Sequence, residues 1–305
     1  MKTKKLEGII PSVNYHLWNP CNMRCKFCFA TFQDAKVVLP KGHLAKEESL
    51  ELVREIAAIG FEKITFAGGE PTLCPWLGEL ITVAKDAGLT TMLVTNGSRL
   101  TDEFLKNNQR NLDWIALSVD SLIPETNLAS GRALTGSRPL PKKYYYQIVD
   151  QVKKYGYGLK INTVVHSNNW TEDMTEFIAY AQPVRWKVLQ VLPIKGQNDG
   201  RIDKFAITNK QFQSFIDNHK HLELETSIVP ESNDQIKGSY AMVDPAGRFY
   251  DNVEGEHKYS RPILEIGSRL AIQQVNYDFS KFVSRGGIYQ WSREMFNSSN
   301  NCHEK

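Results

Sequence analysis

The chain has 305 residues, of which 41% are hydrophobic and 23% are charged, an ordinary composition for a globular protein. Its 37 basic and 34 acidic residues are spread along the chain and give a formal net charge of +3, which does not favour direct nucleic-acid binding. No apolar run approaches the roughly 18 residues of a membrane span, and no apolar segment follows the basic residues 1–5. We therefore expect neither a membrane protein nor a secreted one.

Strand-like and helix-like patterns alternate from residue 13 to residue 192. The predicted strands are 13–18, 63–67, 90–95, 113–119, 159–165 and 185–191, and the predicted helices between them are 47–59, 76–87, 101–108, 143–155 and 171–181. Six β–α repeats predict a parallel sheet with right-handed crossovers. Six units are fewer than the eight of a closed barrel. We therefore predict an α/β fold, an open (βα)6 partial TIM barrel over residues 1–192.

Residues 193–305 lose this alternation and predict a C-terminal α+β extension that closes the active site. The expected elements are a helix at 210–219, a strand at 223–229, a hairpin of 240–243 and 248–250, a helix at 263–274 and a frayed tail from Asn297. Residues 31–46 and 121–141 are predicted to be long irregular connections. Such connections often carry function in a compact domain.

Cys21, Cys25 and Cys28 form a C-x3-C-x2-C run directly after the first predicted strand. Iron–sulfur clusters are held by thiolates and usually take four, so three thiolates predict a cubane with one open iron. Zinc normally binds paired C-x2-C ligands, and the remaining Cys74 and Cys302 are isolated. An odd count of five cysteines also fits a reducing cytoplasm better than a disulfide framework. The spacing resembles that of the radical S-adenosylmethionine (SAM) superfamily, which implies a [4Fe-4S] cluster whose open iron is chelated by SAM.

A Gly68-Gly69-Glu70-Pro71 turn follows the second predicted strand, at the end where parallel barrels build active sites. Glycine allows the backbone to approach a ligand closely. The same superfamily has a GGEP-type turn here, so the resemblance implies contact of this backbone with the amino group of SAM and of Phe27 with its adenine. Other polar residues that we expect near SAM, at the ends of later strands, are Thr95, Asn96, Ser118 and Asn162.

Cations occur on one face of two later strands. Lys160 and Asn162 share a face, and Arg185 and Lys187 share a face on the next strand. The opposite faces are apolar and should pack against helices, so the cations should point into the barrel. Burying an unpaired cation is costly or neutralises it. The pattern therefore predicts a bound anion, such as a polyphosphate.

Over nearly its whole length the chain resembles the viperin family of radical SAM nucleotide dehydratases. The family-specific stretches are Pro-Val-Arg-Trp-Lys-Val at 183–188 and Val-Pro-Glu-Ser-Asn at 229–233. The chain differs at Ala67, where a serine is usual, and around 31–36, and we do not expect the amphipathic membrane-anchoring helix of animal viperins. The resemblance implies that Tyr240 lies near the ribose and that the triphosphate contacts Lys63, Lys160, Arg185, Lys187 and Arg285.

The resemblance also implies the reaction. Cleavage of SAM to methionine and a 5′-deoxyadenosyl radical would lead to abstraction of the ribose C4′ hydrogen of a nucleoside triphosphate. Loss of the 3′-hydroxyl as water would follow, and then uptake of one electron and one proton. The product would be a 3′-deoxy-3′,4′-didehydro nucleotide, a chain terminator in antiviral defence. CTP is the first choice, with UTP and GTP open. An electron donor such as a flavodoxin or ferredoxin is implied.

Three assignments stay open at this point. Tyr240 is a candidate hydrogen or proton donor and equally a hairpin-packing aromatic residue. The chain could instead be another radical SAM enzyme, such as a peptide-modifying maturase. Maturases commonly carry additional C-terminal cysteines, whereas only Cys302 lies beyond Cys74 here. A non-catalytic iron–sulfur redox sensor is the third hypothesis.

Overall fold

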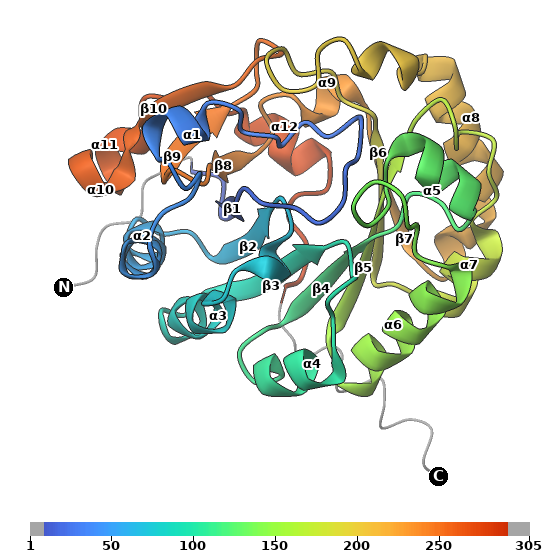
Figure 1. Ribbon diagram of the computed structural model, residues 1–305, viewed down its shortest axis with the longest axis horizontal. Helices are drawn as coiled ribbons and strands as arrows, with labels where there is room; N and C mark the ends of the chain where they lie inside the picture. The colour runs from blue at the N-terminus through green and yellow to red at the C-terminus, as the bar shows by residue number, and fades with distance from the viewer. Residues whose placement is uncertain (1–8, 292–305) are drawn as a thin grey trace.

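A single open sheet forms the centre of the molecule in the computed structural model, which describes residues 9–291. Its strands are β1 (Ser12–Trp18), β2 (Lys63–Gly68), β3 (Thr90–Thr95), β4 (Trp114–Ser118), β5 (Gly158–Val165), β6 (Arg185–Gln190), β7 (Ser227–Glu231), β8 (Ala241–Val243), β9 (Arg248–Asp251) and β10 (Lys258–Pro262). They are hydrogen-bonded in the order β10-β9-β8-β1-β2-β3-β4-β5-β6-β7. All six predicted parallel strands are present and the sheet does not close, which confirms the partial barrel (Figure 1).

Helices on the outside of the curved sheet connect the successive parallel strands (Figure 1). They are α2 (Lys46–Ala58), α3 (Leu77–Asp86), α4 (Asp102–Asn108), α6 (Lys142–Lys154) and α7 (Thr175–Ala181). Helix α6 shows why they pack there: its buried residues Tyr145, Ile148, Val149 and Val152 follow the spacing of one helical face. No helix within residues 9–291 is long and apolar enough to cross a membrane.

The predicted helix at 171–181 begins later than expected, at Thr175. The Asn169 side chain explains the difference, because it accepts a hydrogen bond from the His166 backbone N–H at 2.7 Å and donates to the Val164 carbonyl at 2.9 Å. Asparagine bonds of this kind compete with helical backbone hydrogen bonds. Residues 166–174 are therefore held as a turn.

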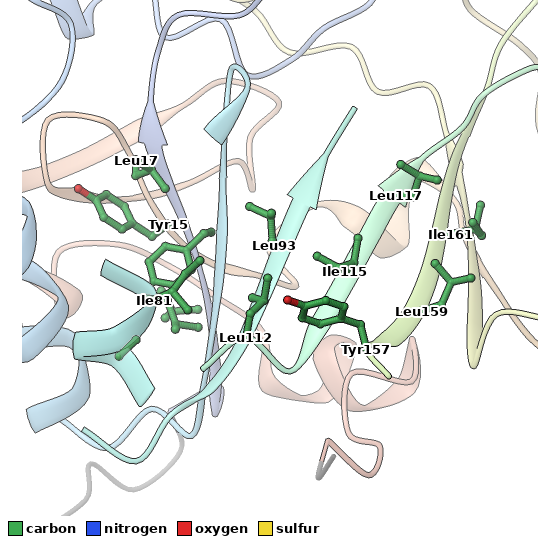
Figure 2. Close-up of a cluster of buried hydrophobic side chains, with 14 of the residues drawn as sticks. Tyr15, Leu17, Ile81, Leu93, Leu112, Ile115, Leu117, Tyr157, Leu159 and Ile161 are labelled. Atoms are coloured by element: carbon green, nitrogen blue, oxygen red, sulfur yellow. The ribbon is translucent and has the colours of Figure 1, made fainter. Parts of the chain in front are cut away.

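The core lies between the outer face of the sheet and these helices. Figure 2 shows the apolar side chains Leu93, Ile115, Leu117, Leu159 and Ile161 on the neighbouring strands β3, β4 and β5, and all are buried. Because side chains alternate along a strand, the residues between them face the barrel lumen. The predicted inward direction of Lys160, Asn162, Arg185 and Lys187 is thus confirmed.

The chain after residue 192 continues the sheet at both ends. Strand β7 pairs parallel with β6, and β8 pairs parallel with β1 and begins the predicted hairpin with β9. The strand predicted at 223–229 starts late, because Lys220–Leu224 form the 3-10 helix η3. Strand β10 was not predicted; it lies at the edge of the sheet, where a proline such as Pro262 is tolerated.

The remaining helices are short. The predicted helix at 210–219 is α8 (Asn209–His219). The one at 263–274 is divided into α10 (Ile263–Ile266) and α11 (Ser268–Ile272) by Gly267, whose φ of +81° is not helical. The others are α9 (Asn233–Ile236), α12 (Phe279–Ser284), η1 (Pro71–Leu73) and η2 (Ile202–Lys204). The predicted frayed tail from Asn297 and Cys302 lie outside the described residues.

The two long connections each contain a helix that the sequence pattern did not show. Residues 31–46 include α1 (Ala35–Val38), and residues 121–141 include α5 (Pro124–Ser130), which has Pro124 at its first turn and Gly131 in a left-handed C-cap at φ 77°. After α5 the chain pairs with the cysteine loop through a β-bridge between Met23 and Leu134. This connection therefore supports the predicted cluster site.

Candidate active site

Every residue predicted to bind the cluster, SAM or the nucleotide lines one cavity of about 940 Å³ inside the barrel. The cysteine loop, the GGEP turn and the ends of β3, β4 and β5 form its wall at the carboxyl ends of the strands. The predicted cations line its deeper part, with Lys63 and Arg185 as the first residues of β2 and β6. The fold thus brings together residues that are more than 260 positions apart in the sequence, from Cys21 to Arg285.

Cys21, Cys25 and Cys28 lie half-buried in the loop after β1 and form no disulfide. The Met23 backbone N–H donates to the Cys21 sulfur at 3.4 Å, and an Arg132 guanidinium nitrogen lies 3.9 Å from the Cys25 sulfur. Burial raises the pKa of the Cys21 thiol to about 11 and that of Cys25 to about 12. These thiols therefore become thiolate ligands only when a metal displaces their protons.

The donor set fits an iron–sulfur cluster better than a single metal ion. Among residues 9–291 no three histidine, cysteine or carboxylate side chains converge as ligands of one metal ion. A cluster does not need such convergence, because each thiolate binds a different iron atom. Three thiols in one cavity-lining loop, with a guanidinium and a backbone N–H directed at two of the sulfurs, suit that arrangement.

The GGEP turn is packed against the cysteine loop. A Cβ atom on Gly68 would overlap the Trp18 carbonyl oxygen, and one on Gly69 would overlap the carbonyl oxygens of Asn19 and Pro20. Both glycines are therefore needed for the approach of the two backbones, whatever else they contact.

Glu70 ties the GGEP turn to the end of β3. Its buried carboxylate accepts hydrogen bonds from the hydroxyl groups of Thr72 at 2.6 Å and Thr95 at 2.7 Å, and from the backbone N–H groups of Thr72 at 3.1 Å and Asn96 at 2.8 Å. Burial raises the pKa of Glu70, and these hydrogen bonds oppose the rise. The side chains of Glu70 and Thr95 thus hold the wall of the cavity together.

A second tie joins the cysteine loop itself to β3. The Asn96 amide donates to the Asn22 side-chain oxygen at 2.9 Å, and the Asn22 amide donates to the Ser98 hydroxyl at 2.8 Å. The Phe27 ring on the other side of the loop packs against His166, with ring centroids 5.0 Å apart. The predicted SAM-contacting residues therefore belong to one connected wall.

Arg132 is a cavity residue that the sequence analysis missed. Its guanidinium forms a buried ion pair with Asp120 at 2.8 Å and donates to the Ser118 carbonyl at 2.8 Å. Ser118 thus contributes its backbone carbonyl oxygen to the hydrogen bond with Arg132. The side-chain oxygen of Asn162, another cavity-lining residue, is buried without a hydrogen-bond partner. Arg132 lies just after α5, inside the predicted irregular connection. No sequence pattern there indicated that its side chain points into the cavity.

Five cations gather in the deeper part of the cavity, and we call them the lumen cations: Lys63, Lys160, Arg185, Lys187 and Arg285. Burial, which is the largest cause, and neighbouring cations together lower the pKa of Lys63 and of Lys187 to about 7. The pKa of Lys160 is well below its ordinary value for the same reasons. So much buried positive charge is unfavourable without an anion.

Residues of the C-terminal segment complete this part of the site. The Tyr289 hydroxyl accepts a hydrogen bond from Lys63 at 2.9 Å, and its ring lies 4.0 Å from the Arg185 guanidinium carbon. Arg185 also donates to the Gly286 carbonyl at 2.8 Å. Arg285 is buried, as its predicted place in the site requires.

Glu231 is the second important residue that the sequence analysis left without a role. Its fully buried carboxylate lies 2.7 Å from the Lys187 ammonium and 3.1 Å from the Arg285 guanidinium, and it accepts a hydrogen bond from the Tyr240 hydroxyl. Burial favours its protonated form, but the two cations lower the pKa of Glu231, so it is ionised. The sequence signal that could have pointed to Glu231 was its position in the family-specific stretch 229–233.

Comparison with known proteins agrees with this geometry. The family model of the radical SAM superfamily matches residues 15–181. A Flammeovirga pacifica protein named S-adenosylmethionine-dependent nucleotide dehydratase is 52% identical over 93% of this chain and 97% of its own length. A Lacinutrix mariniflava protein of the same name is 63% identical over 93% of this chain, and this chain spans 59% of that protein's length.

A vertebrate relative and a solved structure extend the comparison. The Danio rerio S-adenosylmethionine-dependent nucleotide dehydratase RSAD2 is 37% identical over 92% of this chain and 78% of its own length. The solved structure of native anSMEcpe with bound AdoMet and Kp18Cys peptide has a TM-score of 0.66 at 17% identity, over 90% of this chain and 82% of that one, and shows the shared fold. The chain therefore belongs to the S-adenosylmethionine-dependent nucleotide dehydratase family of the radical SAM superfamily, as its resemblance to viperins predicted.

Proposed function

We propose that this protein converts a nucleoside triphosphate, CTP first and UTP or GTP as alternatives, to its 3′-deoxy-3′,4′-didehydro analogue. The observation that carries the proposal is that the lumen cations and the three cysteines line the same cavity. The cations supply a binding place for a polyphosphate, and the cysteines supply one for a cluster. The names of the relatives support a nucleotide as substrate and dehydration as the reaction.

Cys21, Cys25 and Cys28 would hold a [4Fe-4S] cluster, which when bound supplies the electron for reductive cleavage of SAM. The protein's own residues would orient SAM beside it. Phe27 would offer an aromatic surface for the adenine, and the backbone of Gly68 and Gly69, which packs against the cysteine loop, would contact the amino group of SAM. Further residues of the same wall are Glu70, Thr95, Asn96, Ser118 and Asn162.

The lumen cations would hold the triphosphate in the deeper part of the cavity, which places the ribose between them and the cysteine loop. Tyr240 lies at the side of this space, and burial raises the pKa of its hydroxyl well above the ordinary value, so the hydroxyl keeps its proton. A neutral phenol near the ribose suits the role of hydrogen or proton donor. We retain Tyr240 as the candidate for this step.

The remaining components are proposed on chemical grounds. An electron must come from outside, and we propose a flavodoxin- or ferredoxin-like donor. The exposed charged residues that line the cavity within residues 9–291 are all basic, which suits an acidic partner: Arg24, Lys36, Lys41 and Arg201. Unpaired thiols fit a reducing, cytoplasmic environment. A chain-terminating product would serve antiviral defence.

The direct test is incubation of the anaerobically reconstituted enzyme with SAM, dithionite and one nucleotide at a time, followed by mass spectrometry. The proposal expects a product lighter than the nucleotide by one water, formed together with 5′-deoxyadenosine. SAM cleavage without any nucleotide product would favour a different radical SAM reaction, such as peptide modification. Absence of SAM cleavage in a protein with full cluster content would favour the redox sensor.

A further inference from the structure

The carboxylate of Glu231 lies among cations at the open side of the barrel. Glu231 is the last residue of β7, at one edge of the sheet, and it has no exposed side-chain surface. Tyr240, which donates to it, directly precedes β8 on the far side of the opening. Its other partners are Lys187 on β6 and Arg285 after α12. One carboxylate thus joins four separate segments of the chain.

At this opening β7 and β8 are not paired through their backbones, and side-chain contacts connect them instead. Within residues 9–291, β7 has no ladder partner on its outer side, and β8 pairs with β1 and β9. Between them, the Arg285 guanidinium lies 3.7 Å from the centre of the Tyr240 ring and donates to the Ser239 carbonyl at 2.9 Å. The Lys187 ammonium lies 4.6 Å from the same ring. The contacts of Glu231 therefore connect the two sides of the open sheet.

A carboxylate is an unexpected group beside a polyphosphate site, because it repels the ligand. Its contacts have two effects that oppose this repulsion. It raises the pKa of Lys187 against the effect of burial, and it fixes Arg285 and the Tyr240 hydroxyl in one arrangement. A buried cation without a partner tends to lose its proton or turn away from the site. The gain from holding these cations charged and in place therefore outweighs the repulsion between Glu231 and the phosphates.

We propose that Glu231 is a positioning residue of the polyphosphate site, which holds Lys187, Arg285 and Tyr240 in the orientation that receives the phosphates and fastens the C-terminal segment across the open side of the barrel. The inference rests on the proposed function insofar as the ligand is a triphosphate. It concerns a residue that itself need not touch the substrate.

The test compares Glu231→Gln with a matched control, Glu172→Gln, in the full-length, cluster-loaded enzyme. Glutamine keeps the size and hydrogen-bonding capacity of the side chain and removes its charge. Glu172 is half-buried and accepts hydrogen bonds from the hydroxyl groups of Ser121 at 2.5 Å and Thr126 at 2.6 Å, without a lysine or arginine among these contacts. Iron content and thermal unfolding show whether either variant is misfolded.

Inorganic tripolyphosphate is the probe, because its binding depends neither on the base nor on turnover. We expect its dissociation constant, measured by calorimetry, to rise about ten- to a hundredfold in Glu231→Gln, which is the loss of one charge-assisted contact. It should change by less than about twofold in Glu172→Gln, and SAM affinity should be unchanged in both. Equal or tighter tripolyphosphate binding by a folded Glu231→Gln would overturn the proposal.

A pH profile separates this role from a purely structural one. Phosphate binding favours charged Lys187, so affinity falls as the pH rises through the pKa of that lysine in the free enzyme. Removing the carboxylate lowers that pKa, so the fall should begin at lower pH in Glu231→Gln than in the wild type. The charged and titratable groups that surround Lys187 are Lys160, Arg185, Glu231, Tyr240 and Arg285.

The outcomes also distinguish this inference from the proposed function. Wild-type enzyme that binds tripolyphosphate and forms no dehydrated nucleotide would refute the proposed reaction and leave the role of Glu231 standing. Wild-type enzyme that dehydrates CTP, with a Glu231→Gln variant whose tripolyphosphate affinity and pH profile match the wild type, would refute the role of Glu231 alone.

Discussion

The two ends of the barrel cavity satisfy their polar groups in different ways. At the carboxyl ends of the strands, the carboxylate of Glu70 accepts four hydrogen bonds from Thr72, Thr95 and Asn96, and Asp120 pairs with Arg132. In the deeper part, the lumen cations outnumber the carboxylate of Glu231 by five to one. The two carboxylates of the first region are thus paired by protein groups, whereas the second region has an excess of positive charge.

This difference separates scaffold from ligand-binding residues. A buried polar network whose members are all paired stabilises the fold and fixes its geometry. Buried cations without enough partners reduce stability and gain when an anion binds. Substitutions near the GGEP turn should therefore disturb the cysteine loop and the fold, and substitutions of the lumen cations should mainly change the affinity for the nucleotide.

The largest expected effect is loss of the cluster from Cys25→Ala, with Cys21→Ala and Cys28→Ala behaving alike. Each variant leaves two thiols in a site that has three, and no other cysteine lies in the loop. Iron content and visible absorption after anaerobic reconstitution measure the loss. Cys74→Ala is the control, because Cys74 is buried in the hydrophobic core and does not line the cavity. Equal loss of iron in Cys74→Ala would refute the three-cysteine site.

The next largest effect concerns the lumen cations. Lys187→Ala should weaken CTP binding about ten- to a hundredfold, because a charge-assisted phosphate contact contributes roughly 1.5–3 kcal/mol. SAM affinity should hardly change, since Lys187 lies in the deeper part of the cavity. Equilibrium binding of each ligand to the same reconstituted sample measures both. Equal turnover of cytidine and CTP by the wild type would contradict the role of these cations.

A smaller effect is expected from Gly69→Ala at the opposite end. Its methyl group would overlap the carbonyl oxygens of Asn19 and Pro20, so the cysteine loop must shift, at a cost of about 1–3 kcal/mol in the free energy of unfolding. Gly78→Ala is the matched control on helix α3, where the nearest contact is an ordinary 3.4 Å to the Asn108 side chain. Denaturant unfolding of both apo-proteins measures the difference. Similar stability of the two variants would show that the turn is not tightly packed.

Most residues of the two cavity regions could be predicted from the sequence, because they lie on regular strands or at the ends of strands. Alternation along β5 and β6 gave the inward direction of Lys160 and Lys187, and the strand ends gave Thr95 and Ser118. Local patterns were sufficient here, since the direction of a side chain on a strand depends on its immediate neighbours.

Residues that depend on distant parts of the chain could not be predicted in the same way. The strand predicted at 223–229 ended two residues before Glu231, so Glu231 was not placed on a strand. Tyr240 and Arg285 contact Glu231 only because the sheet stays open at this point. Arg132 follows a short helix stabilised by Gly131 in a region without periodicity. Such contacts arise from the meeting of separate segments, which no local pattern contains.

The smallest expected effect tests whether the C-terminal segment depends on the ligand that the lumen cations bind. Residues 279–291 connect to these cations through Arg285 itself, the Gly286 carbonyl and the Tyr289 hydroxyl. Tyr289 and Trp291 also lie close to Lys63 and Trp114, the first residues of β2 and β4, so the segment covers the end of the barrel opposite the cysteine loop.

We predict that CTP slows hydrogen exchange and proteolysis in residues 279–291 and that SAM alone does so less. A bound triphosphate would relieve the repulsion among the lumen cations and favour the closed arrangement, which shields the site from water. A chain truncated after Ser280 should still bind the cluster and make little product, because it lacks Arg285 and Tyr289. Hydrogen-exchange mass spectrometry with and without CTP is the direct measurement, and residues of the hydrogen-bonded GGEP region serve as the internal control. Equal protection of residues 279–291 in both states, for a nucleotide that the enzyme turns over, would mean that the arrangement of this segment does not depend on the ligand of the lumen cations.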